Sequence, residues 1–247
     1  MSEKIRFYAG FAAGLVWLAV CSVIGFARLA FGPHDRSATT FYARLFCTRL
    51  ARAVGWSIDV DRPEGLLEHR PCVFISNHQS ILDVIVFGAI VPARTVALGK
   101  KEVGRIPLFG WFFRAAGNLI VDRGNSAQTG ATLDQAAEII RTERLSVWIM
   151  AEGHRNDGAT LLPFKTGAFR LAAAAGVPIV PVVAEPLDAV VNTATRRTRP
   201  GPLRIRVLDP IPPPGTGAES ITAAVSEARG RMQQALDALR ADAPPPV

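Results

Sequence analysis

The chain has 247 residues, of which 49% are hydrophobic, and its 28 Lys and Arg residues outnumber 21 Asp and Glu residues to give a formal net charge of +7. This length allows a sizeable core in one large domain or two small ones, and a basic, apolar composition suits an anionic membrane surface, an anionic substrate or nucleic acid. We expect no nucleic-acid partner, because zinc-finger spacing and RNA-binding aromatic runs are missing. The three cysteines, Cys21, Cys47 and Cys72, are scattered, which predicts buried hydrophobic side chains in a reducing compartment.

The first segment of the chain is typical of a membrane helix. Residues 7–27 contain no charge and are flanked by Lys4 and Arg6 before and Arg28 after. Such a helix is about 30 Å long, enough to cross a bilayer. Basic residues on both sides give no single-span orientation, so we favour a helix that dips into the inner leaflet, with an ordinary span as the equal alternative. A signal peptide is disfavoured, because the apolar run is long and no clear cleavage site follows.

A partner helix for this segment is predicted at residues 41–56. Its apolar side chains alternate with arginines, as in an interfacial basic helix: Phe41, Leu45, Phe46 and Leu50 with Arg44, Arg49 and Arg52. Gly10 and Gly14 form a small-residue pair of the kind found where helices pack closely. Residues 1–56 are therefore expected to be membrane-anchoring helices.

Strand and helix patterns alternate from residue 57 onward. Strands are predicted at residues 73–75, 95–98, 118–121, 146–150, 179–184 and 204–208. Helices are predicted at residues 80–90, 106–116, 127–144, 167–175 and 221–239. This alternation indicates one α/β domain over 57–242 with a largely parallel or mixed sheet flanked by helices, followed by a frayed tail at 243–247.

The most informative motif lies where the first predicted strand gives way to a helix. His78 and Asp83 stand there, five positions apart, and both would be roughly 140° apart if they shared one helix. His78 must therefore lie in the turn, where an imidazole can act as a general base and a carboxylate can orient it. The alternative is structural, because Ser80 and Asp83 fit a helix-capping pattern and Asn77 is a common turn residue.

Further polar segments follow other predicted strands. Glu152 and Arg155 lie in a turn after a buried strand, with Gly153 between them. An arginine fork suits a phosphate and a carboxylate suits a hydroxyl, although a solvated turn with a surface ion pair fits the same pattern. Lys165 precedes a predicted helix start, where anions bind well, whereas Lys100 is equally compatible with a surface charge.

Together these segments resemble the glycerolphosphate acyltransferase family over residues 60–210, in particular its members that acylate lysophosphatidate. A first motif of the form NHxSxxD is matched by Asn77, His78, Ser80 and Asp83. A second, GNxxxDR, is matched by Gly117, Asn118, Asp122 and Arg123. The third, FPEGTRS, reads MAEGHRN at 150–156, keeping only Glu152, Gly153 and Arg155. A VPIVPV-like strand follows at 177–182, after an FKTGAF run at 164–169.

The resemblance implies an O-acyltransferase of phospholipid synthesis that needs no cofactor and no metal. It would move a fatty acyl group from acyl-CoA or acyl carrier protein to the 2-hydroxyl of 1-acylglycerol-3-phosphate. Its partners would be these donors, the lyso-phospholipid acceptor and membrane lipids. Its place would be the cytoplasmic face of the bacterial inner membrane.

The resemblance also implies roles for individual residues. His78 would be the general base and Asp83 its orienter, while Glu152 would hold the glycerol hydroxyls of the acceptor. The acceptor phosphate would be bound by Arg155, Arg123, Lys100 and Lys165. Asn77 and Gly153 would complete the substrate site, and Pro178 and Pro181 would shape the acyl side.

Three other functions stay open at this point. The altered third motif fits acylation of another lyso-lipid, such as a lyso-ornithine lipid or a lysophospholipid. A non-catalytic lipid-binding membrane protein is disfavoured, because it has no use for a base such as His78. A His/Asp hydrolase would consume the acyl thioester without an acceptor.

Overall fold

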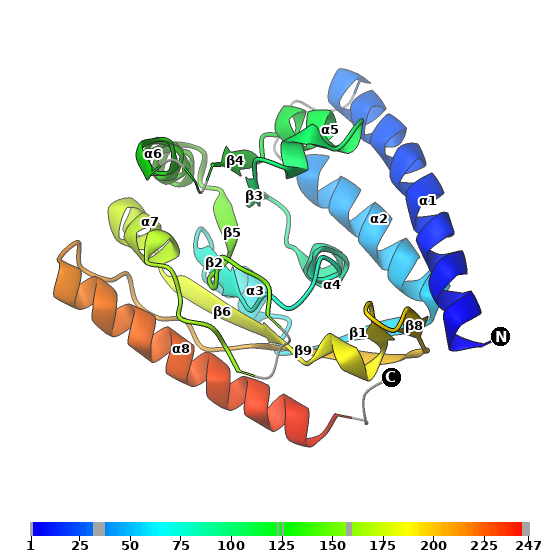
Figure 1. Cartoon of the computed structure of the whole chain (residues 1–247). Helices are drawn as coiled ribbons and strands as arrows, with labels where there is room; N and C mark the ends of the chain where they lie inside the picture. The colour runs from blue at the N-terminus through cyan, green and yellow to red at the C-terminus, as the bar shows by residue number, and fades with distance from the viewer. Residues whose placement is uncertain (1, 32–37, 123, 125, 157–159, 244–247) are drawn as a thin grey trace.

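The fold is described by a computed structural model that covers residues 2–31, 38–122, 124, 126–156 and 160–243. At its centre is a seven-stranded sheet in the order β1-β9-β6-β2-β5-β3-β4 (Figure 1). The strands are β1 (Trp56–Asp61), β2 (Val73–Ser76), β3 (Thr95–Lys100), β4 (Leu119–Val121), β5 (Ser146–Met150), β6 (Ile179–Ala184) and β9 (Gly201–Val207). A small antiparallel ribbon is formed by β7 (Val191–Asn192) and β8 (Arg197–Thr198).

Most neighbouring strands of the large sheet run parallel. β2 pairs parallel with β5 and β6, and β3 pairs parallel with β4 and β5, whereas β6 and β9 pair antiparallel. Ser76 at the end of β2 lies opposite Met150 and Val182. The carboxyl ends of these strands therefore meet at one edge, which is where sites form in such sheets. The predicted α/β class with a mixed, mainly parallel sheet is confirmed.

Helices cover both faces of the sheet. They are α1 (Glu3–Phe31), α2 (Ala38–Val54), α3 (Gly65–Glu68), α4 (Asp83–Ile90), α5 (Phe109–Ala115), α6 (Ser126–Glu143), α7 (Gly167–Ala175) and α8 (Ala218–Ala241). Two short 3-10 turns, η1 (Val103–Arg105) and η2 (Leu187–Ala189), complete the described elements. α6, α7 and α8 lie on one side, and α2 and α4 on the other (Figure 1).

Alternation along β2 shows how one strand serves both layers. Val73 and Ile75 belong to the core cluster beneath α6, α7 and α8, while Phe74 belongs to the cluster beneath α2 and α4. Successive side chains of a strand point to opposite faces, so a strand covered on both sides reads as a continuous apolar run. This is why the buried central strands were predictable from sequence.

Edge and end positions were harder to predict. β1 was missed although its apolar and polar residues alternate as in a half-buried strand, with Asp59 and Asp61 exposed. The helix predicted at residues 41–56 extended too far, because α2 ends at Val54 and Trp56 begins β1. α4 begins at Asp83 and not at residue 80, since the intervening residues form the turn that carries His78. Of the expected tail at 243–247, all but Ala243 lies outside the described residues.

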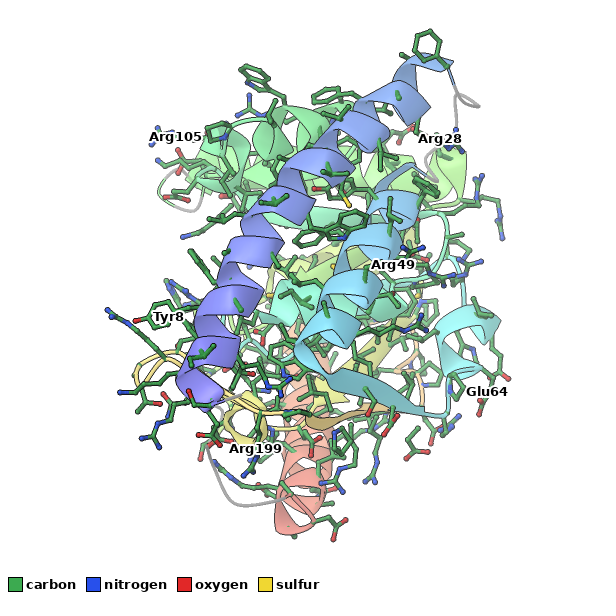
Figure 2. The ribbon with its side chains drawn as sticks, turned by 90° about the vertical axis from the view of Figure 1, so that its right-hand side faces the viewer. Tyr8, Arg28, Arg49, Glu64, Arg105 and Arg199 are labelled. Carbon is green, nitrogen blue, oxygen red and sulfur yellow. The ribbon has the colours of Figure 1, made fainter. Side chains whose placement is uncertain are left out.

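The N-terminal helix packs along the body of the protein. Ideal β-carbons added to Gly10 and Gly14 would meet Val54 and Leu50 of α2, so the small residues allow a close approach. Nearer its other end, Gly25 lies against Phe112 of α5. Figure 2 shows α1 and α2 side by side across this face of the molecule. By length and composition α1 could cross a membrane, and only 17% of its most apolar window is buried.

Candidate active site

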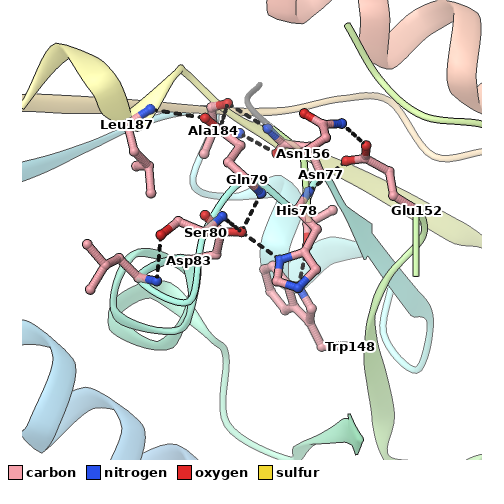
Figure 3. A network of polar contacts seen from close by, with 12 residues as sticks. Asn77, His78, Gln79, Ser80, Asp83, Trp148, Glu152, Asn156, Ala184 and Leu187 are labelled. Atoms are coloured by element: carbon pink, nitrogen blue, oxygen red, sulfur yellow. Dashed lines mark hydrogen bonds and ion pairs between the residues drawn. The ribbon is translucent and has the colours of Figure 1, made fainter. Parts of the chain in front are cut away.

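His78 and Asp83 form a hydrogen-bonded pair at the carboxyl edge of the sheet (Figure 3). His78 lies in the turn after β2, and Asp83 is the first residue of α4. The distance between His78 Nδ1 and Asp83 Oδ2 is 2.7 Å. The same oxygen accepts the backbone N–H groups of Gln79 at 2.6 Å and Ser80 at 3.0 Å. The hydrogen bonds of the turn therefore fix the orientation of the imidazole.

The surroundings of the pair suit a general base. The Asp83 side chain is 1% exposed and that of His78 is 16% exposed. A carboxylate that accepts two backbone N–H groups is held as an acceptor, so Nδ1 carries the proton and Nε2 keeps its lone pair. At the start of α4 no side-chain cap hydrogen bond forms, and Asp83 bonds backwards to the turn. The bond from Ser80 N–H is the contact that the capping alternative expects, so Asp83 fastens the turn as well as the ring of His78.

Two amide side chains fasten the turn to the end of β6. Asn77 is buried, accepts the N–H of Ala184 at 3.0 Å and donates to its carbonyl at 2.9 Å. Gln79 donates to the carbonyl of Glu185 at 2.9 Å and accepts the N–H of Leu187 at 3.0 Å. Both ends of the Asn77 amide are thus engaged by backbone, which indicates a positioning role for a residue expected at the substrate. The contribution of Gln79 was missed, because its partners lie more than 100 positions away.

Glu152 occupies an interior position beside His78. It is 1% exposed, so the expectation of a solvated turn with a surface ion pair is wrong for this residue. Its Oε1 accepts the N–H of His78 at 2.7 Å, while Oε2 accepts the N–H of Leu162 at 2.9 Å and a bond from the side-chain amide of Asn156. Burial raises the pKa of Glu152, and the backbone hydrogen bonds act in the opposite direction. The carboxylate is therefore committed to protein donors.

Three of the four expected phosphate-binding residues lie on the same edge, namely Arg155, Lys165 and Lys100. Arg155 and Lys165 are exposed, and the stem of Lys165 lies against Gly153, whose φ is +73°. Lys100 ends β3 and lies 3.9 Å from Glu102. Arg123 lies outside the described residues. The edge thus carries exposed cations that can meet an anionic acceptor in front of a buried carboxylate network.

The second sequence motif, around β4, has a structural role. Asn118 accepts the N–H of Ala97 at 2.8 Å and donates to the carbonyl of Phe113 at 3.0 Å. Asp122 pairs with Lys101 at 2.9 Å, and this ammonium group lowers the pKa of the Asp122 carboxyl. Within the described residues no group of three His, Cys, Asp or Glu side chains is placed to hold a metal.

Of the two prolines expected on the acyl side, Pro178 directly precedes β6 and Pro181 lies within it. The carbonyl of Pro178 accepts the N–H of Val73, and Pro181 lies opposite Ile75. Val73 begins β2, whereas His78 follows the end of that strand. Pro178 therefore lies at the far end of β2 from the imidazole.

Comparison with known proteins places this arrangement in a family. The profile of the family described as Acyltransferase matches residues 57–185. The 1-acyl-sn-glycerol-3-phosphate acyltransferases of Salmonella typhimurium and Escherichia coli are 33% and 32% identical to the chain, each over 88% of this chain and 87% of the relative. The crystal structure of the 1-acyl-sn-glycerophosphate acyltransferase of Thermotoga maritima superposes with a TM-score of 0.74 at 22% identity, covering 96% of this chain and 95% of that one. The chain belongs to the acyltransferase family.

Proposed function

We propose that this protein is a 1-acylglycerol-3-phosphate O-acyltransferase. It transfers a fatty acyl group from acyl-CoA or acyl carrier protein to the 2-hydroxyl of lysophosphatidate and yields phosphatidate. The observation that carries the proposal is the buried Asp83 carboxylate 2.7 Å from Nδ1 of a part-exposed His78 at the carboxyl edge of parallel strands. The assignment of the substrate is supported by relatives that are named for this activity and are 32–33% identical to the chain over most of its length.

His78 supplies the proton transfer that the reaction needs. The acceptor hydroxyl has too high a pKa to attack a thioester unaided, so Nε2 removes its proton as the new C–O bond forms, an effect of about 10²–10⁴-fold. Asp83 stabilises the resulting imidazolium and keeps Nδ1 protonated. Collapse of the tetrahedral intermediate breaks the C–S bond, and the departing thiolate takes the proton back from His78. No acyl-enzyme forms, so Ser80 has no nucleophilic role.

The acceptor phosphate is held by cations at the edge of the sheet. Arg155, Lys165 and Lys100 are exposed there, and Arg123 is assigned to the same role through the family motif. A guanidinium offers two parallel donors to a phosphate, whereas an ammonium offers a point charge. Glu152 and Asn77 are reassigned from substrate binding to positioning, because their polar atoms are engaged within the protein.

Association with a membrane follows from the surface of α1. Its outward side chains are apolar and exposed: Ile5, Phe11, Leu15, Val16, Val23 and Phe31. Ile106 and Leu108, just before α5, and Trp111 within it are exposed apolar residues too. Tyr8 accepts a hydrogen bond from Arg196 at 3.1 Å and Gly25 packs on Phe112, so α1 contacts the body towards both of its ends.

A helix bound along its length by its own domain cannot also cross a bilayer without giving up those contacts. We therefore assign α1 to the plane of the cytoplasmic leaflet of the bacterial inner membrane, where the apolar face is buried and basic side chains meet anionic headgroups. This position brings the lipid acceptor and the soluble acyl donor to the same enzyme.

One assay tests the proposed function. Purified protein in detergent is incubated with acyl-CoA and, separately, lysophosphatidate, a lyso-ornithine lipid or lysophosphatidylcholine, and the products are identified by mass. We expect phosphatidate as the main product and no thioester loss without an acceptor. A main product from another lyso-lipid would favour the second candidate, which the departures at Ala151, His154 and Asn156 in the third motif support. Thioester loss without an acceptor would indicate a hydrolase.

A further inference from the structure

The C-terminal helix α8 contacts the segment that follows the third motif. Arg229 and Gln233 lie one helical turn apart on α8, which is outside the residues matched by the family profile. Arg229 Nη2 donates to the carbonyl of Leu161 at 2.6 Å, and its Nε donates to the carbonyl of Leu162 at 3.3 Å. Gln233 Oε1 accepts the N–H of Leu161 at 2.9 Å. Three main-chain groups of two neighbouring residues are therefore bound by α8.

One of these contacts sets the direction of a hydrogen bond in the active site. The carbonyl of Leu161 and the N–H of Leu162 belong to the same planar peptide unit. Fixing the oxygen with Arg229 therefore aims the N–H, which donates to Glu152 Oε2 at 2.9 Å. The other carboxylate oxygen of Glu152 accepts the N–H of His78 at 2.7 Å. A continuous series of bonds thus runs from α8 to the backbone of the catalytic base.

Asn156 closes this network on the other side of His78. Its N–H donates to the carbonyl of His78 at 3.0 Å, and its side-chain amide donates to Glu152 Oε2. The described hydrogen-bond partners of the Glu152 carboxylate are all donors, so an amide at this position would turn its NH₂ group towards one of them. The series of hydrogen bonds from α8 to His78 therefore depends on the Glu152 carboxylate, which is held in place by residues outside the third motif.

We propose that Arg229 and Gln233 are positioning residues of the acyl-transfer reaction. Through the Leu161–Leu162 peptide and Glu152, they fix the backbone of His78 in the position from which its ring reaches the acceptor hydroxyl. The inference depends on the proposed function only for the reaction that this positioning serves. A displacement of a catalytic group by about 1 Å can lower the rate about 100-fold. α8 therefore contributes to turnover and not only to stability.

The test combines kinetics with a signal from His78 itself. The full-length protein in detergent is labelled with ¹⁵N-histidine, and the His78 backbone amide is identified among the 4 histidines by its loss in His78→Ala. The variants are Arg229→Ala, Gln233→Leu and Arg229→Lys. The control is Arg231→Ala on the same helix, because Arg231 donates to the backbone carbonyl of Asp209 and to the side-chain carboxylate of Glu227, away from Glu152.

We expect Arg229→Ala and Gln233→Leu to shift the His78 amide resonance and to lower kcat about tenfold, with both KM values changed by less than about twofold. Arg229→Lys should restore part of the loss, and Arg231→Ala should change neither signal. An unshifted His78 resonance with normal kcat in the two variants would overturn the proposal, as would equal losses in Arg231→Ala. If the wild type does not acylate lysophosphatidate, the proposed function fails while the resonance shifts still test the positioning.

Discussion

Two turns that follow adjacent parallel strands use a buried carboxylate in different ways. Asp83 follows the turn after β2 as the first residue of α4, whereas Glu152 lies in the turn after β5, and both residues are 1% exposed. Asp83 bonds the ring of His78 at Nδ1, whereas Glu152 bonds its main-chain N–H. A single base is therefore oriented twice, once through its ring and once through its backbone, by acids separated by 69 positions (152 minus 83).

The difference lies in what each acid does during the reaction. The charge on Asp83 opposes the charge that develops on the imidazole, so its effect grows in the transition state. Glu152 hydrogen-bonds backbone and amide donors whose charges do not change, and its charge acts on the His78 imidazole without a hydrogen bond to the ring, so its main contribution is to geometry. Substitutions at the two positions should therefore differ in size and in kind.

Asp83→Asn should give the largest loss of the two. The amide keeps the shape but presents an NH₂ group to the donors around it, and the imidazole loses both its tautomer and its counter-charge. We expect kcat to fall about 10³-fold, with little change in the free energy of unfolding. Steady-state kinetics and denaturant unfolding measure both quantities. If Asp83→Asn mainly lowers stability, the acid serves the fold and not the base.

Glu152→Gln should give a smaller loss of about 10–100-fold in kcat. One backbone or side-chain donor then faces another donor, and His78 shifts without losing its ring partner. Kinetics with varied acceptor separate this effect from binding, since we expect the acceptor KM to stay close to the wild-type value. A rise in KM at unchanged kcat would return Glu152 to the glycerol-binding role implied by the family motif.

The raised pKa of Glu152 also predicts how stability depends on pH. The folded protein binds the Glu152 proton more tightly than the unfolded chain does. The contribution of Glu152 to stability therefore falls as pH rises from the pKa of Glu152 in the unfolded chain to its raised pKa in the folded protein, and it is constant above that pKa. Thermal unfolding of the wild type and Glu152→Gln across this range isolates the effect. The wild type should lose stability relative to the variant as pH rises, and parallel curves would show that the pKa is not raised.

Arg155→Ala tests the outer part of the same turn and should leave the base untouched. We expect the acceptor KM to rise about tenfold for lysophosphatidate, a discounted figure because the side chain is exposed, while the donor KM stays constant. Arg155→Lys should recover only part of the affinity. Unchanged kinetics would mean that the phosphate is bound elsewhere or that the acceptor has none, which would favour a different lyso-lipid.

The smallest effect on turnover is expected from the exposed face of α1. Phe11→Ser with Val16→Ser removes two apolar side chains from the proposed membrane surface and should lower binding to anionic vesicles about tenfold or more. Leu67→Ser is the control, since Leu67 is 57% exposed on α3 and away from α1. Activity on micellar acceptor should be unchanged in both. Equal vesicle binding by all three proteins would place the anchor elsewhere.

Local patterns predicted the parts of the site that are near one another in sequence. His78 and Asp83 are 5 positions apart, and the turn between a buried strand and a helix was readable from residues 73–90. The role of Glu152 was assigned differently, because its bond to His78 spans 74 positions and no periodicity reveals it. The same holds for Arg229, whose partners lie 67 and 68 positions away.

Both carboxylates act through His78, so this residue gives the most direct test of the account. Phosphatidate formation from acyl-CoA and lysophosphatidate is measured by mass for the wild type and for His78→Ala, with circular dichroism and vesicle binding as checks on fold and anchoring. The account predicts a folded, membrane-bound variant whose turnover is lower by at least about 10³-fold. Near-normal phosphatidate formation by a folded His78→Ala protein would contradict it.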